Sequence, residues 1–323
     1  MVVGMFRAMF ARSLALGMVG LFMGGASHAA TFELKEDDRG VTVRVDGALF
    51  TRYLKKSGAK PILFPVVGPT GVEMTRGYPM RPVGPKEKKD HIHHRSLWFT
   101  HGDVNGISFW HENEKHGTIV HREFLEVQGG KAGRIVARND WIGQDGKRVC
   151  QDRRTFVFHA DAKRRWIDVE IVVTASDGDV VFGDTKEGSF GVRVAGSMRS
   201  ELPDGGTIVN SRGDKNKAAW GKQAEWVDYY GPAGGQVVGL AILNHPSSFR
   251  FPTYWHVRTY GLFAANPFGW HDFLRDQSVD GSYRLKSGDS FTLRYRVVLH
   301  TGDEKEGAIA EIYRAYAAAS GRP

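Results

Sequence analysis

The chain has 323 residues, a formal net charge of +8 and one cysteine, Cys150. A lone cysteine excludes an internal disulfide framework, so stability must come from a buried apolar core, which this length allows. The positive charge is scattered, and its two short clusters at 86–89 and 163–165 are typical of solvated turns. We therefore expect no nucleic-acid partner, while the sequence leaves the oligomeric state open.

Residues 1–29 have the pattern of a secretory signal peptide. Arg7 and Arg12 precede a short apolar run at 13–25, and small residues follow it. A membrane-spanning helix needs about 20 apolar residues, which this run lacks. We expect cleavage before Ala30, a periplasmic or secreted protein, and no stable membrane span after cleavage.

The rest of the chain alternates apolar and polar residues with a period of two. The clearest runs lie at 41–45, 167–173, 190–194 and 293–299, and Asp-Gly turn signals recur between such runs. Strict alternation predicts strands with one buried face. The sequence therefore predicts a single all-β domain over residues 30–323, built as a large antiparallel β-sandwich.

One helix is predicted, near the C-terminus. Ile309, Ile312 and Tyr316 share one helical face, and acidic residues at 303–306 precede them, where the helix dipole favours negative charge. We expect this helix to pack on the outside of a sheet.

Five of the 13 histidines lie between His91 and His111, beside aromatic residues, Arg95 and Glu112. Neutral imidazole and carboxylate groups bind metals or move protons near neutral pH. Burying so many of them without partners would cost folding free energy. This segment is therefore the first candidate for a functional site.

Two chemical interpretations of the segment remain open. On an extended backbone, His91, His93 and Arg95 would share one side and His94 the other, and the first two histidines could chelate a divalent metal ion. Their third ligand could come from His245, His256 or Glu112. Alternatively, the histidines act as general acid or base without metal, or only bond to loop backbone. No cofactor is firmly predicted.

A second polar face is predicted at 254–260. Tyr254, His256, Arg258 and Tyr260 alternate with Trp255 and its apolar neighbours. An aromatic, histidine and arginine lining is typical of sugar-binding clefts. Whether this face and the 91–94 segment form one site is not decided by the sequence.

Several of these segments also resemble a known bacterial family. They are the run from Asp90 to Arg95 with Asn105-Gly106 and Phe109-Trp110, the run 184–188 with Arg193, Trp220-Gly221 with 226–229, His245-Pro246, and 255–268. The family is catalogued as "methane oxygenase PmoA" and also as a domain of unknown function. The resemblance implies a galactose-mutarotase-like β-sandwich in exported proteins of polysaccharide-degrading bacteria. In such folds the sugar lies on the concave face of a large sheet.

The favoured hypothesis is an exported carbohydrate-active enzyme that uses His/Glu acid–base chemistry for elimination, hydration or epimerisation of a sugar or oligosaccharide. The alternatives are a non-catalytic sugar-binding protein and a His-ligated metal oxidoreductase, as the family name suggests. The candidate catalytic residues are His91, His93, His94, Glu187, His245 and His256. The candidate substrate-binding residues are Arg95, Asn105, Trp110, Lys186, Arg193, Trp255, Arg258 and Asn266.

Overall fold

The computed structural model describes residues 1–4, 30–84 and 87–319. The signal-peptide prediction falls almost entirely on residues 5–29, which lie outside the described residues. Within the described ranges, no helix combines the length and apolar character needed to cross a bilayer.

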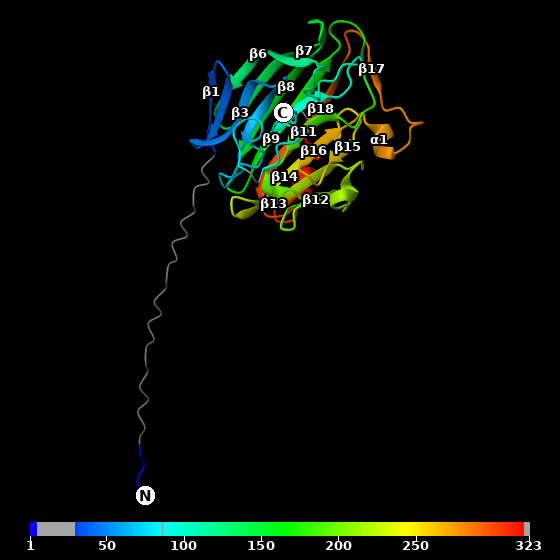
Figure 1. Cartoon of the computed structure of the whole chain (residues 1–323). Coiled ribbons are helices and arrows are strands. Elements are labelled where there is room, and N and C mark those ends of the chain that lie inside the picture. The colour runs from blue at the N-terminus through cyan, green and yellow to red at the C-terminus, as the bar shows by residue number, and fades with distance from the viewer. Residues whose placement is uncertain (5–29, 85–86, 320–323) are drawn as a thin grey trace.

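Two eight-stranded antiparallel sheets stack face to face and form a sandwich (Figure 1). This architecture, with a helix at the C-terminal end, confirms the predicted all-β fold class. The first sheet has the order β1 (Phe32–Asp37), β2 (Gly40–Val45), β3 (Ala48–Ser57), β4 (Lys60–Val66), β5 (Leu97–His101), β11 (Gly188–Arg193), β16 (Leu262–Asn266), β15 (Tyr254–Val257). The second has the order β12 (Thr207–Asn210), β13 (Trp226–Ala233), β14 (Gln236–Asn244), β18 (Ser290–Thr301), β9 (Arg165–Thr174), β8 (Arg148–Ala160), β7 (Gly133–Ile142), β6 (Thr118–Gln128). A two-stranded sheet pairs β10 (Val180–Phe182) with β17 (Tyr283–Leu285).

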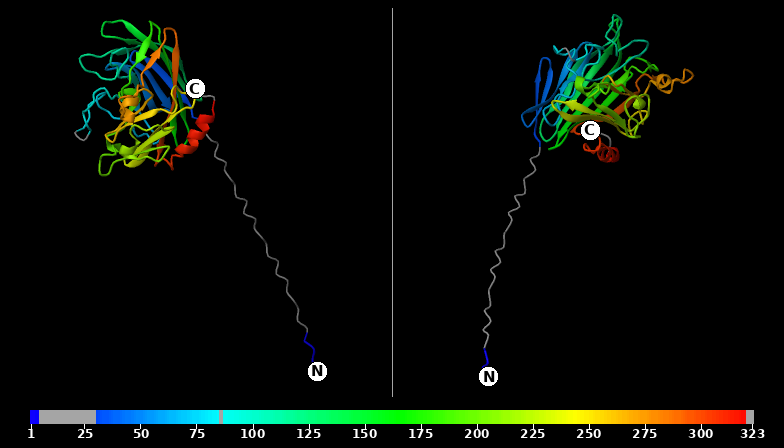
Figure 2. Two further views of the ribbon diagram at one scale, coloured as in Figure 1. Left: turned by 90° about the vertical axis from the view of Figure 1, so that its right-hand side faces the viewer. Right: turned by 60° about the horizontal axis from the view of Figure 1, so that its bottom comes forward.

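The described residues form two α-helices, which lie on different sides of the molecule (Figure 2). The predicted helix is α2 (Ile309–Ala318), which places Ile309 and Tyr316 on the outer face of the second sheet. The other, α1 (Trp270–Leu274), follows β16 in a segment predicted as a loop. Five residues are too few to produce a helical periodicity in the sequence.

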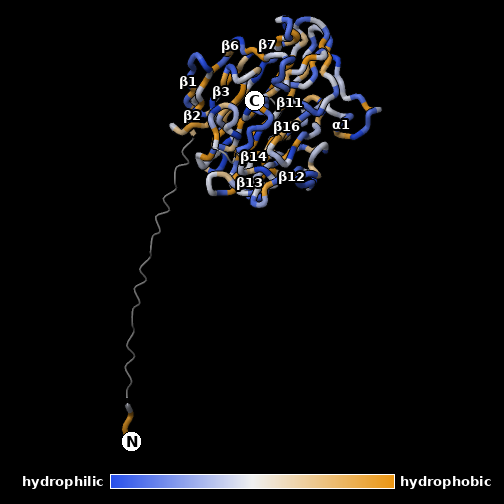
Figure 3. The backbone as a smooth tube through the Cα atoms, viewed as in Figure 1, coloured by the Kyte–Doolittle hydropathy of each residue, from blue (hydrophilic) through white to orange (hydrophobic). Residues whose placement is uncertain are grey.

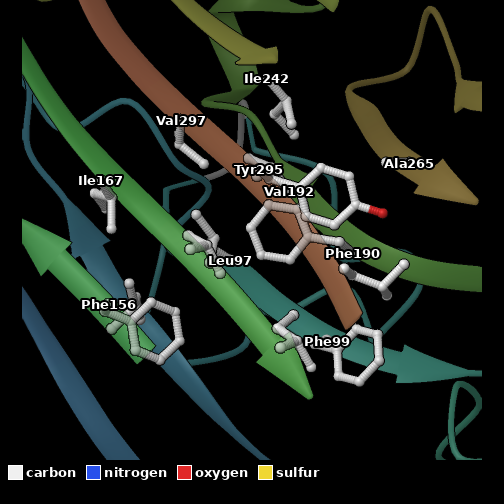
Figure 4. Packing of buried hydrophobic residues seen from close by; sticks show 14 of the residues in the cluster. Leu97, Phe99, Phe156, Ile167, Phe190, Val192, Ile242, Ala265, Tyr295 and Val297 are labelled. Atoms are coloured by element: carbon white, nitrogen blue, oxygen red, sulfur yellow. The ribbon is translucent and has the colours of Figure 1, made fainter. Parts of the chain in front are cut away.

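The core lies between the sheets and is built by the predicted alternation. Phe190 of β11 and Tyr295 of β18 stack across the interface, with ring centroids 4.8 Å apart and planes at 3° (Figure 4). Figure 3 shows hydrophobic stretches along the strands and hydrophilic ones in the loops. Burial of these apolar faces supplies the main stabilisation, roughly 25 cal/mol per Å².

The outer face of the first sheet carries a smaller apolar cluster. Its buried members are Ile62, Trp98, Trp110, Leu262 and Ala264. Trp98 of β5 lies directly over Gly191 of the neighbouring strand β11, because a Cβ atom at 191 would come within 2.7 Å of the indole ring. Because Gly191 has no side chain, the indole ring of Trp98 can pack directly against the backbone of β11.

We expect Gly191→Ala to lower the free energy of unfolding by about 1–3 kcal/mol, because the added methyl group must displace a buried indole. Urea unfolding followed by tryptophan fluorescence measures this change. Gly84→Ala is the matched control, since a Cβ atom there meets nothing within 4 Å. Equal stability of the two variants would contradict the proposed packing.

Candidate functional site

Residues 91–94 form a tight turn, named here the histidine turn. The amide of His94 donates a hydrogen bond to the carbonyl of His91 (2.9 Å), and His91 has a left-handed φ of 44°. The extended backbone predicted for this segment is therefore wrong. The reversal brings the imidazoles of His91 and His94 onto the same side, where they stack with centroids 4.7 Å apart and planes at 3°.

Asp90 anchors the histidine turn to two arginines that are almost fully buried. Its Oδ1 accepts hydrogen bonds from Arg76 (2.6 Å) and Arg193 (2.8 Å). Burial would raise the pKa of Asp90, but the neighbouring Arg193 and Arg76 lower it to about 2. The carboxylate therefore stays ionised at any physiological pH.

The other oxygen of Asp90 lies 3.2 Å from Nδ1 of His91. With its hydrogen on Nδ1, the imidazole would direct that hydrogen toward this carboxylate and leave the lone pair of Nε2 free. The side chain of His91 is 42% exposed, which leaves this imidazole open to solvent. This is a histidine oriented by a carboxylate, the arrangement that general bases use.

Tyr260 joins the two segments that the sequence could not connect. Its ring stacks on His91 with centroids 5.2 Å apart and planes at 3°, and it covers the guanidinium of Arg193 at 4.8 Å. Burial raises the pKa of Tyr260 to about 12, so the phenol keeps its proton. The histidine turn and the end of the 254–260 segment therefore lie side by side.

His93 and His94 are supporting groups with depressed pKa values. His94 stacks on Trp98 (5.5 Å, 16°), and its Nδ1 accepts a hydrogen bond from Arg193 at 2.9 Å. Burial holds the pKa of His94 well below its usual range, and burial with His111 and Lys60 lowers that of His93 to about 3. Both imidazoles are neutral near pH 7.

Arg95 does not face a substrate, because it is bonded to Glu112. Its Nη2 donates to Glu112 at 2.6 Å, and the fully buried Lys60 donates to the same carboxylate at 2.7 Å. Burial would raise the pKa of Glu112, but Arg95 and Lys60 lower it to about 2, while burial lowers the pKa of Lys60 to about 8. Arg95 thus fixes the segment after the histidine turn.

No group of three or more His, Cys, Asp or Glu side chains is arranged to hold a metal ion in the described part of the chain. His91 and His93, the predicted ligand pair, have ring centroids 5.8 Å apart and planes at 80°. The carboxylate of Glu112, a predicted third ligand, accepts hydrogen bonds from the side chains of Lys60 and Arg95 instead.

His256 holds the loop that carries Lys186 and Glu187. Its Nδ1 donates to the carbonyl of Lys186 at 2.7 Å, and burial lowers its pKa to about 4. Asn266 holds the same loop, since its side-chain amide donates to the carbonyl of Thr185 at 2.9 Å. Lys186 in turn lies 3.9 Å from Glu187. His256 and Asn266 are therefore structural supports.

A pocket of about 220 Å³ opens beside these residues. Arg258 separates it from the histidine turn, with its guanidinium carbon 5.8 Å from the ring centres of both Trp220 and Tyr260. We name it the cationic pocket, and its lining consists of Lys217, Trp220, Val257, Arg258, Thr259 and Arg275.

Other predicted site residues lie elsewhere or are enclosed. Trp255 is fully buried between the sheets, because the period of two that places His256 on the outer face of the sheet turns its neighbours inward. His245 follows β14 and packs on Tyr316 of α2 (4.9 Å), beyond the second sheet. Asn105 closes an exposed turn by accepting from the amide of Val181 (2.7 Å). These three predictions are corrected.

Trp110 and Arg193 are near the site but too deeply buried to contact a substrate directly. Trp110 lies beneath His93 and His94, with ring centroids 6.2 and 5.5 Å away. Arg193 uses its guanidinium on Asp90 and His94. Both position the histidine turn.

The sequence analysis missed residues whose role depends on distant partners. The sequence did indicate two of them, since Asp90 directly precedes the histidines and Tyr260 lies on the predicted polar face. Trp220 was marked only by the family resemblance, and Arg76 not at all, because nothing near Arg76 in the sequence indicates the contacts it makes.

The chain belongs to a family of unknown function, DUF6807, whose model matches residues 40–314. This agrees with the part of the resemblance that named a domain of unknown function, and it attaches no methane-oxygenase activity to the chain. No curated protein matches the sequence.

Several solved structures are similar at low identity. They include a galactose mutarotase-like protein from Clostridium acetobutylicum (10% identity, TM-score 0.36, 84% of this chain and 98% of that one). An alpha-galactosidase from Lactobacillus brevis matches at 8% identity and TM-score 0.39, covering 87% of this chain and 41% of that one. A Glycoside Hydrolase Family 97 enzyme from Pseudoalteromonas sp. strain K8 matches at 13% identity and TM-score 0.32 (84% and 34%). The chain spans less than half the length of these two hydrolases.

We expect the free energy of unfolding to fall as the pH drops from 7 to 4. An unfolded histidine titrates at about pH 6.5, whereas His256 in the fold has a pKa of about 4 and His94 also resists protonation. The unfolded chain therefore binds more protons throughout this window, and stability is lost on acidification. Urea midpoints at pH 7, 6, 5 and 4 measure the slope. His256→Gln should flatten it, and an unchanged slope would contradict the assignment.

Proposed function

We propose that this DUF6807 protein is a carbohydrate-active enzyme with His91 as its general base. The observation that carries the proposal is the His91–Asp90 pair: an exposed imidazole whose Nδ1 faces a carboxylate that two buried arginines keep ionised. A non-catalytic binding surface needs no such pair. Tyr260, stacked against the imidazole, adds the aromatic surface on which sugar rings pack.

In the proposed reaction, Nε2 of His91 takes a proton from a sugar carbon next to a carbonyl or carboxylate group. Asp90 stabilises the imidazolium that forms. Arg258, exposed beside Tyr260, lies where it can hold the negative charge that develops on the substrate oxygen. The Tyr260 phenol, which keeps its proton at neutral pH, can return a proton. Such a set of groups suits elimination, hydration or epimerisation.

The earlier candidates take different roles in this proposal. His256 was considered as the acid, but its Nδ1–H is already donated to the Lys186 carbonyl, and its low pKa leaves it neutral. Glu187 remains a candidate for proton transfer, since its loop lies beside Tyr260 and its charge acts on that phenol. Retaining hydrolysis is not proposed, because it needs two carboxyl groups about 5 Å apart.

We expect His91→Asn to lower turnover by about 10²- to 10⁴-fold while leaving the fold intact. Asparagine removes the base and tolerates the left-handed backbone at this position. The assay is loss of the C–H signal by ¹H NMR in D₂O with a panel of uronides and keto-sugars, together with ultraviolet absorption for unsaturated products.

His159→Asn is the matched control, since that histidine stacks on Trp166 on the outer face of the second sheet. It should retain full turnover. If the wild-type protein binds sugars of the panel without proton exchange or product, the non-catalytic binding protein becomes the correct interpretation.

Export is part of the proposal and rests on the N-terminal sequence. We expect the intact mass of protein recovered from the periplasm or medium to match a chain that begins at Ala30. Replacing Arg7 and Arg12 by glutamate should retain the uncleaved chain in the cytoplasm. Recovery of the full-length chain in the periplasm would contradict cleavage.

A further inference from the structure

We infer that the cationic pocket binds an anionic substituent, a carboxylate or a sulfate ester, of the sugar that lies over the histidine turn. The substrate class is then an acidic sugar rather than a neutral one. This deepens the proposed function and rests on it in placing a sugar against His91 and Tyr260.

The first argument is charge. Three of the six lining residues are cations, Lys217, Arg258 and Arg275, and no carboxylate lines the pocket. Among the residues that the structure describes, none of the three has an Asp or Glu within ion-pair distance, although most other arginines on this molecule do. Like charges gathered around one pocket repel each other, and a bound anion removes that repulsion.

The second argument is the aromatic floor. The guanidinium carbons of Arg258 and Arg275 lie 5.8 and 6.0 Å from the Trp220 ring centre. The indole Nε1–H of Trp220 is buried and has no hydrogen-bond partner within the described ranges. The lining thus offers an apolar surface with two guanidinium groups, a combination that recognises planar carboxylates and sulfates.

The third argument is position. Arg258 contacts both Trp220 in the pocket and Tyr260, which stacks on His91. His256 also packs against Trp220, with ring centroids 6.2 Å apart. A sugar that lies over His91 and Tyr260 can therefore present a charged group to Arg258, the lining cation that Tyr260 contacts. The pocket volume of about 220 Å³ accommodates such a group.

The test is titration calorimetry on the mature wild-type chain with three probes: methyl galacturonoside, methyl galactoside and galactose 6-sulfate. We expect at least one anionic probe to bind about tenfold or more tightly than the neutral glycoside, and the difference to shrink at high salt. The better of the two anionic probes tells which group the pocket takes.

Arg258→Gln and Lys217→Gln should each remove most of the charge preference. Their matched controls are Arg39→Gln and Lys131→Gln, both exposed side chains far along the sequence from the pocket, which should retain it. The inference is overturned if the neutral glycoside binds as tightly as the anionic ones. It is also overturned if inorganic sulfate alone binds as tightly as galactose 6-sulfate, since the pocket would then be a simple ion site.

Binding and turnover separate the two proposals. If anionic probes bind more tightly and this preference depends on Arg258, but no proton exchange occurs, the cationic pocket is supported and the proposed catalysis is contradicted. If a neutral sugar exchanges its proton, this exchange is lost in His91→Asn, and no charge preference is found, the catalysis is supported and the anion-binding role of the pocket is contradicted.

Discussion

The candidate site depends on one buried electrostatic arrangement, in which Arg76 and Arg193 share the carboxylate of Asp90. Two guanidinium groups removed from water need an anion and a full set of acceptors. Arg76 finds further acceptors in the carbonyls of His91 and His94. The backbone of the histidine turn therefore adopts a conformation in which its carbonyls accept the hydrogen bonds of Arg76. This conformation also fixes the orientation of His91.

A series of stacked rings on the outer face of the first sheet also supports His91. Gly191 allows Trp98 to lie flat, His94 stacks on Trp98, and His91 with Tyr260 completes the series. Trp98 and His94 are buried in this series, whereas His91 is exposed and Tyr260 partly exposed. A reactive group on a rigid support needs little further ordering when substrate binds.

On the outer face of the first sheet, the carboxylates near the histidine turn are paired with cations, whereas the cations of the cationic pocket are not paired with carboxylates of the described residues. The carboxylates of Asp90 and Glu112 are each bound by two cations of the protein, while Arg258 and its neighbours in the cationic pocket face outward. A substrate with a negative group would therefore meet a surface that orients it, with the base at one end and the cations at the other.

The sequence by itself determined the fold class and indicated where along the chain the candidate site begins. A period of two defined β2, β9, β11 and β18, and helical spacing defined α2, because alternation and amphipathicity are local properties of a chain with a buried core. The same alternation placed His256 on the outer face and Trp255 on the opposite one, which excludes Trp255 as a substrate-binding residue. The density of polar groups marked the segment that begins at Asp90.

Only the tertiary structure decided which of these groups act together. The order β5-β11-β16-β15 brings Arg193 and Tyr260 to the histidine turn, whereas β14 carries His245 into the other sheet, beneath α2. Arg76 and Trp220 enter the site through strand order and loop path, which no local pattern encodes. The physical reason is that ion pairs and ring stacking depend on distances in space, and in an antiparallel sandwich those distances are set by pairings between strands remote in sequence.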